Sequence, residues 1–272
     1  NPLHIGASIK PYTYAWRGPR DNMVDYSHLS HIVVTPCRDE SDFLPSIIDS
    51  MSRQTVIPTK WVIVSHNSGD KTNHILEEAC ANLGWIKVME VNDDSPRRRG
   101  AQIAKLVNKG LDSTDFEWDY FSKIDSDMIL PSDYFEKIFD EFHNSEDLGI
   151  ASGSCYIVNR GRKIDEVVAP KHTRGGLKTY RRGCFLEIGG IREIDGWDGI
   201  DNSLAQMAGW QTSSFPNISV EHQRATGSYS GLVRGCFESG KFAFSMRYLP
   251  IFILARSIVR MGKKPLIVGG IS

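Results

Sequence analysis

Short apolar runs alternate with amphipathic stretches through the first half of the chain, and this alternation constrains the fold more than any other feature. The runs are rich in β-branched residues and nearly continuous, as in strands that are covered on both faces. The stretches between them carry apolar residues at helical spacing. Strands that alternate with helices predict right-handed βαβ units and a mainly parallel sheet. The expected strands are 31–35, 60–65, 86–91 and 120–124, and the expected helices cover 43–51, 75–83, 103–111 and 134–142.

Composition limits the class of protein. The chain has 272 residues, of which 40% are hydrophobic and 24% charged, as in a soluble protein with one large α/β domain or two small ones. A net charge of −1 argues against binding nucleic acid through bulk electrostatics. The longest strongly apolar run, 248–255, is far shorter than the roughly 20 residues that span a bilayer. Five widely spaced cysteines without a C-x-x-C pair favour free thiols in a reducing compartment. We therefore expect a cytoplasmic protein.

Two aspartates follow directly after the fourth expected strand. Asp125 and Asp127 flank Ser126 just past the run 120–124. Carboxylates at the carboxyl end of a strand lie at the rim of the sheet, where open α/β sheets bind ligands. A hard cation held by one or two carboxylates keeps positions open for substrate phosphates. The same spacing also occurs in ordinary surface turns, so the pair alone leaves a metal site and a turn both open.

Several segments between about residue 31 and residue 256 match, in order, the motifs of one protein family. Residues 36–40 are similar to its P-x-x-N-E loop, with Asp39 in place of Asn, and 50–55 are similar to its S-x-x-x-Q-T helix end. Residues 62–72 resemble its second strand and the turn after it, and 97–101 occupy the place of its a-R-N-x-G segment. In this order the chain resembles family 2 glycosyltransferases with the GT-A fold. The resemblance implies an α/β GT-A fold with a Rossmann-like, mainly parallel central sheet flanked by helices and an acceptor-binding C-terminal half.

The resemblance also implies an activity. Such an enzyme is an inverting transferase that moves a sugar from a nucleotide diphosphate to a hydroxyl of a saccharide or lipid-linked acceptor, in surface polysaccharide or glycoconjugate synthesis. The family usually has an aspartate at the position of His66, which hydrogen-bonds the nucleotide base. His66 or Asn67 would make that contact here, and this departure leaves the base open: UDP is the default expectation, and GDP and dTDP are the alternatives. The implied nucleotide-sugar contacts are Pro36, Arg38, Glu40, His66, Asn67, Asp70, Arg98, Arg99, Lys123, Asp125, Ser126 and Arg224.

A cation and arginines would stabilise the departing diphosphate. The resemblance implies Mn²⁺, or Mg²⁺, held by Asp125, Asp127 and a late histidine, His222. Imidazole suits Mn²⁺ better than Mg²⁺, although a lone histidine is more often structural. The arginines at 97–99 are read equally well as a solvated basic turn.

An inverting transferase needs a base for the acceptor hydroxyl. In the family this base is the aspartate of an E-D-x-x-L-A motif at the start of a helix. Asp201 has the position of that aspartate, and Ile200 stands in place of the glutamate. Asp198 is the alternative base, and Asp201 is read otherwise as the cap of a helix that begins at residue 202. The implied donor and acceptor pocket contains Gly175, Gly176, Arg181 and Trp197, of which Arg181 also fits a surface charge and Trp197 a core position.

The expected organisation is a single GT-A domain. It comprises an arm at 1–30, a nucleotide-sugar-binding half at 31–130 and an acceptor and catalytic half at 131–235. Residues 236–272 form an amphipathic helical region with interleaved apolar and cationic side chains. That region fits peripheral contact with the cytoplasmic face of a membrane, or a helix packed on the core.

Two other functions compete with this one. A nucleotidylyltransferase of sugar phosphates also uses carboxylate-held metal on an α/β sheet, but it would need a glycine-rich loop after the first strand, and residues 36–40 contain no glycine. A non-catalytic nucleotide-sugar-binding module is kept open by Ile200 and His66, which depart from the family pattern.

Overall fold

The computed structural model describes residues 24–224, except 96, 99, 167, 168 and 170, together with residues 251, 254, 255, 257 and 258. The C-terminal region expected at 236–272 therefore lies almost wholly outside the described residues, as does most of the expected arm. No helix in the described part is long and apolar enough to cross a bilayer. Four of the five cysteines lie in the described part, and all four are free thiols.

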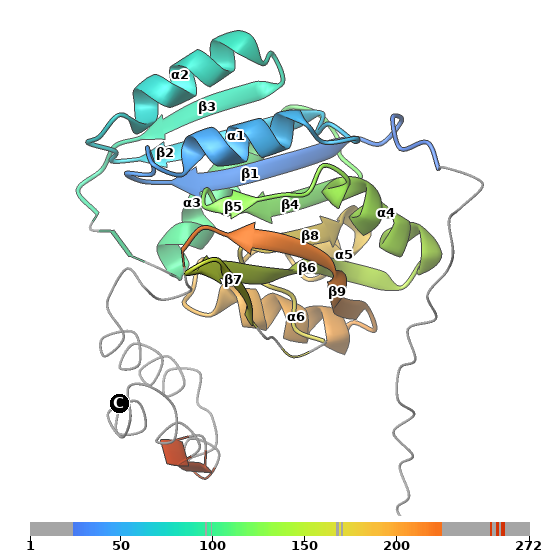
Figure 1. The fold of residues 1–272 in the computed structure, drawn as a ribbon. Helices are drawn as coiled ribbons and strands as arrows, with labels where there is room; N and C mark the ends of the chain where they lie inside the picture. Colours follow the sequence, from blue (N-terminus) through green and yellow to red (C-terminus); the bar gives the residue numbers. More distant parts are fainter. Residues whose placement is uncertain are drawn as a thin grey trace, which may run out of the picture.

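One mixed sheet organises the described residues, with strand order β3-β2-β1-β4-β8-β6-β9-β5 and β7 paired to β6 (Figure 1). The four expected strands are confirmed and run parallel to one another. The strands are β1 His31–Cys37, β2 Lys60–His66, β3 Ile86–Val91, β4 Tyr120–Ile124, β5 Met128–Ile129, β6 Leu148–Asn159, β7 Arg162–Glu166, β8 Leu177–Arg181 and β9 Gln211–His222. The α/β fold with a mainly parallel half, expected from the sequence, is therefore present.

Helices cover both faces of this sheet. The four expected helices are confirmed, and two further segments of the second half are also helical. The helices are α1 Leu44–Ser52, α2 Thr72–Asn82, α3 Ala101–Asp112, α4 Tyr134–Asn144, α5 Arg182–Glu187 and α6 Trp197–Met207. Val33 belongs to the core cluster under α1, α2 and α4, whereas Ile32 and Val34 belong to the cluster under α3, α5 and α6. Successive side chains of a strand point to opposite faces, so a strand covered on both sides reads as a continuous apolar run.

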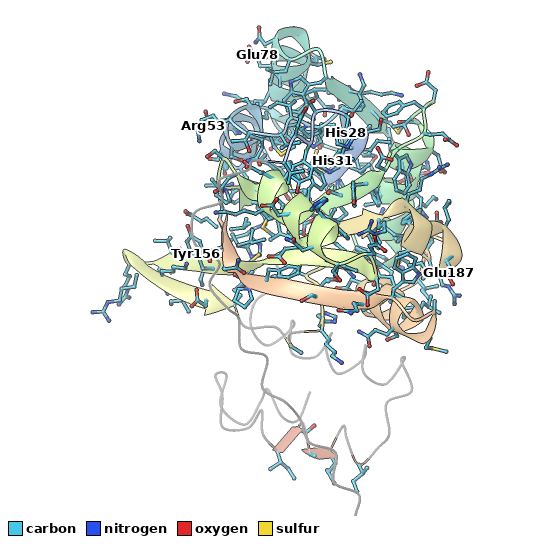
Figure 2. The ribbon with its side chains drawn as sticks, turned by 90° about the vertical axis from the view of Figure 1, so that its right-hand side faces the viewer. His28, His31, Arg53, Glu78, Tyr156 and Glu187 are labelled. Carbon is cyan, nitrogen blue, oxygen red and sulfur yellow. The ribbon has the colours of Figure 1, made fainter. Side chains whose placement is uncertain are left out.

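Polar groups also lie inside this core. His31 at the start of β1 is 1% exposed and packs edge-on against Phe135 and Phe139 of α4. Figure 2 shows it inside the molecule, whereas Arg53 and Glu78 lie at the periphery. Its Nε2 lies 2.8 Å from Ser122 Oγ on β4. The Nδ1 atom has no hydrogen-bond partner within the described residues.

The second half of the chain inserts antiparallel strand β8 between β4 and β6. Strand β9 then runs parallel to β6 and ends beside the two-residue strand β5. Since β5 begins at residue 128, this arrangement brings the last described strand to the Asp125–Asp127 segment.

Candidate active site

Asp127 lies where the end of β4 meets the end of β9. Met128 pairs with His222, so the Nε2 atom of His222 lies 3.3 Å from Oδ2 of Asp127. Arg224 Nε donates to the same Oδ2 atom at 2.6 Å. Asp127 is 4% exposed and His222 8%. The structure thus brings together three of the residues that the resemblance implies for the metal and diphosphate.

The charges of this cluster support one another. Burial alone would raise the pKa of Asp127, but the hydrogen bond and charge of His222, together with Arg224, lower it overall. Burial alone would lower the pKa of His222, but hydrogen bonds to Asp127 and Glu166 raise it to about 9. The cluster therefore holds an ionised carboxylate next to cationic groups.

The donor set at this point fits a divalent cation. A carboxylate oxygen and an imidazole nitrogen converge, and both are ligands that Mn²⁺ accepts. Asp125 is instead held by Lys123, whose Nζ donates to Asp125 Oδ1. Among the described side chains, no three His, Cys, Asp or Glu residues are placed to hold a metal by themselves. A cation here would be coordinated by Asp127, His222 and substrate oxygens. Asp125 could become a further ligand only if its bond to Lys123 were broken.

Two guanidinium groups meet on Glu40 beside this cluster. Arg224 Nη2 donates to Glu40 Oε1 at 2.7 Å, and Arg97 Nη2 donates to the same oxygen at 2.8 Å. Glu40 is only 3% exposed, and its Oε2 has no hydrogen-bond partner within the described residues. Burial raises the pKa of Glu40, and Arg224 offsets part of this rise. Guanidinium forks suit phosphate oxygens, so this corner can receive a diphosphate.

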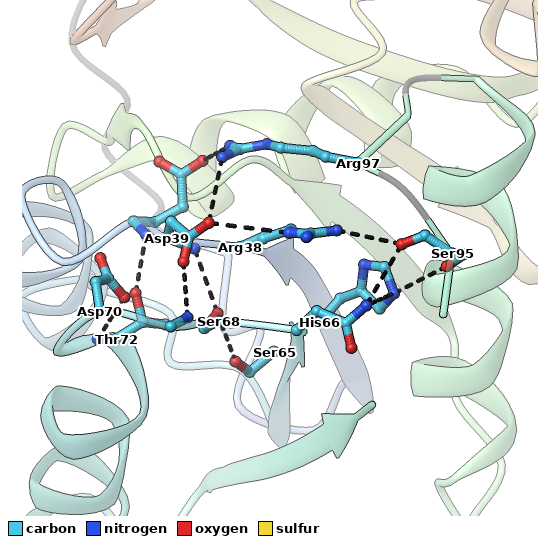
Figure 3. Close-up of polar contacts among 12 residues, drawn as sticks. Arg38, Asp39, Ser65, His66, Ser68, Asp70, Thr72, Ser95 and Arg97 are labelled. Carbon is cyan, nitrogen blue, oxygen red and sulfur yellow. Dashed lines mark hydrogen bonds and ion pairs between the residues drawn. The ribbon is translucent and has the colours of Figure 1, made fainter. Parts of the chain in front are cut away.

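His66 and Asn67 take part in a polar network at the ends of β2 and β3. His66 Nε2 lies 2.9 Å from Asp93 Oδ1, and Asn67 Nδ2 donates to the Asp93 carbonyl at 2.6 Å. Arg38 reaches the same loop, with Nη1 3.5 Å from the Ser95 carbonyl (Figure 3). Sequence reasoning missed Asp93 and Ser95, whose one signal is their place directly after a strand. Both implied base-binding residues are thus held by the 93–95 loop.

Other implied donor residues have local structural roles. Asp70 accepts hydrogen bonds from the backbone N–H groups of Ser41 and Thr72, at 3.2 and 2.9 Å, in the turn before α2. The backbone N–H of Arg98 donates to Gln102 Oε1 at 2.9 Å near the start of α3. Pro36 lies in β1, Ser126 is 4% exposed, and Arg99 lies outside the described residues.

Gly175 and Gly176 lie between two carboxylates. A Cβ atom on Gly175 would stand 2.7 Å from Asp198 Oδ2, and one on Gly176 would stand 2.7 Å from Asp125 Oδ2. Asp198, in the first turn of α6, is half-buried. The two glycines therefore let the backbone pass close to both acidic side chains.

Asp201 lies one turn further along α6 and is 2% exposed. Its Oδ1 accepts from Lys178 Nζ at 2.6 Å, and its Oδ2 accepts from the Tyr180 hydroxyl. Helix α6 begins at Trp197 rather than at 202, so Asp201 lies within the helix and does not cap it. Trp197 is 5% exposed, and its ring has Lys178 Nζ 5.5 Å from the centroid, in a largely core position. Sequence reasoning gave no role to Lys178 or Tyr180, because their contacts with Asp201 depend on how β8 packs against α6.

Arg181 is not brought to this site. It pairs with Tyr120 at the opposite end of β4 from Asp125. Its guanidinium donates to the backbone carbonyls of Phe142, Ser145 and Leu148, at 2.7, 3.0 and 3.0 Å. These bonds hold the end of α4 against the sheet, so Arg181 has a structural setting rather than the pocket setting expected from the sequence.

Solved structures with this fold include a mannosyltransferase and two proteins in complex with UDP or a UDP sugar. The mannosyltransferase PcManGT from Pyrobaculum calidifontis, in complex with GDP-Man and Mn²⁺, matches with a TM-score of 0.61 at 15% identity over 81% of this chain and 65% of its own. TarS 1-349 from S. aureus in complex with UDP-GlcNAc gives 0.56 at 16% identity over 79% of this chain and 66% of its own. GalNAc-T7 with UDP, GalNAc and Mn²⁺ gives 0.57 at 14% identity over 74% of this chain and 45% of its own.

The chain thus spans just under two thirds of the length of the first of these structures. No curated protein sequence matches it. The family model for glycosyl transferase family 2 matches residues 32–191, which is more than half of the chain. These residues include the parallel strands β1 to β4 except His31, the Glu40 loop, the Asp125–Asp127 segment and the Gly175–Gly176 pair. The chain therefore belongs to glycosyl transferase family 2.

Proposed function

We propose that this protein is a metal-dependent inverting glycosyltransferase. It transfers a sugar from a nucleotide diphosphate to a hydroxyl of a saccharide or lipid-linked acceptor, in surface polysaccharide or glycoconjugate synthesis. The observation that carries the proposal is the convergence of Asp127, His222 and Arg224 with Glu40 and Arg97 at the rim of the sheet. This corner offers ligands for a cation together with two guanidinium groups for a diphosphate.

Departure of the diphosphate builds negative charge on its oxygens. Arg97 and Arg224, which share Glu40 Oε1 in this structure, can turn toward those oxygens and stabilise that charge. Mn²⁺ held by Asp127 and His222 would supply further Lewis-acid stabilisation when bound. Lys123 neutralises Asp125 beside the same rim, so the donor does not meet an unpaired carboxylate there.

We assign the acceptor's base to Asp198, with Asp201 as the alternative. A base must reach a hydroxyl within hydrogen-bond distance. The carboxylate of Asp198 is half-buried and borders Gly175, whereas both Asp201 oxygens are engaged inside the protein. The Asp198 carbonyl accepts from Lys178 Nζ and Asn202 Nδ2, which fixes the start of the helix that carries it.

UDP sugars are the first donors to test and GDP sugars the second, because solved structures of this fold are in complex with UDP-GlcNAc and with GDP-Man. The test measures donor hydrolysis and transfer with and without EDTA, followed by addition of Mn²⁺. We expect EDTA and Asp127→Asn to abolish turnover, with Asp49→Asn on the surface of α1 as the matched control. Turnover that is indifferent to chelators would overturn the metal-dependent proposal.

The base is tested in the same assay. Asp198→Asn is expected to remove transfer while leaving nucleotide binding intact. Full activity of Asp198→Asn together with loss in Asp201→Asn would move the base to Asp201.

A non-catalytic nucleotide-sugar-binding module is the second candidate. Asp201 has the position of the family's base, but both of its carboxylate oxygens already accept hydrogen bonds, from Lys178 and Tyr180. This observation favours a protein that binds the donor without catalysis. Calorimetric binding of a nucleotide diphosphate without turnover of any donor would support this reading over the first.

A further inference from the structure

The two ring nitrogens of His222 face two different carboxylates. Nε2 lies 3.3 Å from Asp127 Oδ2, and Nδ1 lies 2.9 Å from Oε2 of Glu166, the last residue of β7. The Glu166 side chain is 14% exposed and that of His222 10%. The imidazole is therefore held between one candidate metal ligand and one carboxylate from a separate strand.

This arrangement selects the nitrogen that a cation can use. A cation that binds Nε2 displaces the proton from that nitrogen of the protonated imidazole, while the carboxylate acceptor at Nδ1 keeps the other proton on Nδ1. The lone pair then lies on Nε2, the atom that faces Asp127. Carboxylates that accept from the second nitrogen of a metal-bound histidine commonly fix its orientation and increase its basicity.

Glu166 is itself held in place. Residue 166 pairs with Cys155 in the β6–β7 hairpin, so its backbone belongs to the sheet. Arg174 Nη2 donates to Glu166 Oε2 at 2.6 Å, and Arg174 Nη1 donates to the Glu166 carbonyl at 3.1 Å. Arg174 directly precedes the Gly175–Gly176 pair that separates Asp125 from Asp198. Glu166 Oε2 thus contacts both His222 and Arg174, the residue that leads into the glycine pair.

We propose that Glu166 is a positioning residue of the metal site, which presents Nε2 of His222 to a divalent cation and ties that site to the 174–176 segment through Arg174. This role rests on the metal site of the proposed function. It also assigns a task to the β6–β7 hairpin, which the resemblance leaves without one.

The experiment measures binding of Mn²⁺ alone, by electron paramagnetic resonance of the free ion and by calorimetry. Glu166→Ala is expected to weaken Mn²⁺ binding about 10- to 100-fold, the usual cost of removing such a partner. Glu166→Gln retains an oxygen that can accept from Nδ1 and is expected to fall between wild type and Glu166→Ala. Asp165→Asn, the neighbouring residue at 75% exposure, is the matched control and is expected to bind as wild type does.

A double-mutant cycle with His222→Ala separates positioning from general structural support. If Glu166 acts through His222, Glu166→Ala changes Mn²⁺ affinity by less than about twofold in the His222→Ala background. An equal loss in both backgrounds, or wild-type affinity in Glu166→Ala, overturns the role of Glu166 alone. A wild-type protein that takes up no Mn²⁺ overturns the metal site of the proposed function and this role with it.

Discussion

The backbone of Gly176 lies directly against the carboxylate of Asp125, so that a Cβ atom at position 176 would stand 2.7 Å from Asp125 Oδ2. Gly175 has the same relationship to Asp198. Contacts this short do not occur between real Cβ atoms and their neighbours, so any side chain here must displace a carboxylate. The glycine pair therefore limits how closely the backbone can approach the carboxylates of Asp125 and of the proposed base, Asp198.

Gly175→Ala is the direct test of that spacing. We expect the Asp198 carboxylate to move by a fraction of an ångström to about 1 Å and kcat to fall up to about 100-fold, as displacements of that size can cause. Gly84→Ala, where nothing lies within 4 Å of the added atom, is the control and should keep wild-type kcat. A Gly175→Ala enzyme with unchanged kcat would show that Asp198 does not act in the reaction.

Lys178→Met should destabilise the fold rather than only reduce activity. Lys178 is fully buried and is paired with the buried Asp201, so methionine leaves a carboxylate without its cation. Breaking a buried pair on one side costs about 3–5 kcal/mol in unfolding free energy. Urea denaturation measures this, with Lys105→Met on the exposed face of α3 as the control. A loss below about 1 kcal/mol would contradict a stabilising Lys178–Asp201 ion pair.

Arg224→Gln should weaken binding of a nucleotide diphosphate. Arg224 bonds to Asp127 and Glu40 in this structure, and a hydrogen bond to a charged group contributes about 1.5–3 kcal/mol, or roughly 10- to 100-fold in affinity. Calorimetry with UDP and with GDP measures the change, and Arg53→Gln on the surface of α1 serves as the control. Unchanged affinity in Arg224→Gln would show that Arg224 does not bind the diphosphate and only holds the carboxylates of Asp127 and Glu40 in place.

Stability should fall in mild acid because of His31. Burial lowers the pKa of His31 to about 3, below its ordinary value of 6.5. Between these values the unfolded chain binds a proton that the folded protein does not, so the free energy of unfolding falls by about 1.4 kcal/mol per pH unit as pH decreases below 6.5. Above pH 6.5 the residue adds no pH dependence.

Urea midpoints of His31→Gln at pH 6.5 and 5.5 measure this contribution. Because the unfolded imidazole is only half protonated at pH 6.5, the variant should lose about 1 kcal/mol less than wild type over that unit. His74→Gln, on the exposed surface of α2, should behave as wild type does. Equal losses in wild type and His31→Gln would contradict a buried neutral imidazole.

The first half of the fold was predictable because its strands are covered on both faces. Continuous apolar runs and helical stripes reveal β1 to β4 and the helices between them without any knowledge of contacts. The second half is harder to read because its strands carry polar residues into the interior. Lys178 in β8 is the example, since its partner, Asp201, is a helix away in the sequence. Helix α6 also begins earlier than expected, after Gly196 with a left-handed φ of 82°.

The site shows the same division. Asp127, His222 and Arg224 followed from the order of the family's segments, and the structure brings them together. Glu166 had no comparable signal, because its approach to His222 depends on the register of β6 with β7 and β9. The register of β6 with β9 shifts between Gly153 and Ser154, which no local pattern of the sequence reveals.

The order of the strands also bears on how the protein is made. His222 ends β9, which lies between β6 and β5, and it is 95 positions downstream of Asp127. A chain still emerging from the ribosome can complete β1 to β4 and their helices while the cation corner has no histidine. Arg224 of the proposed diphosphate site follows His222 two residues later, so both sites are completed last, and fragments that stop before residue 211 should acquire neither full nucleotide affinity nor manganese affinity.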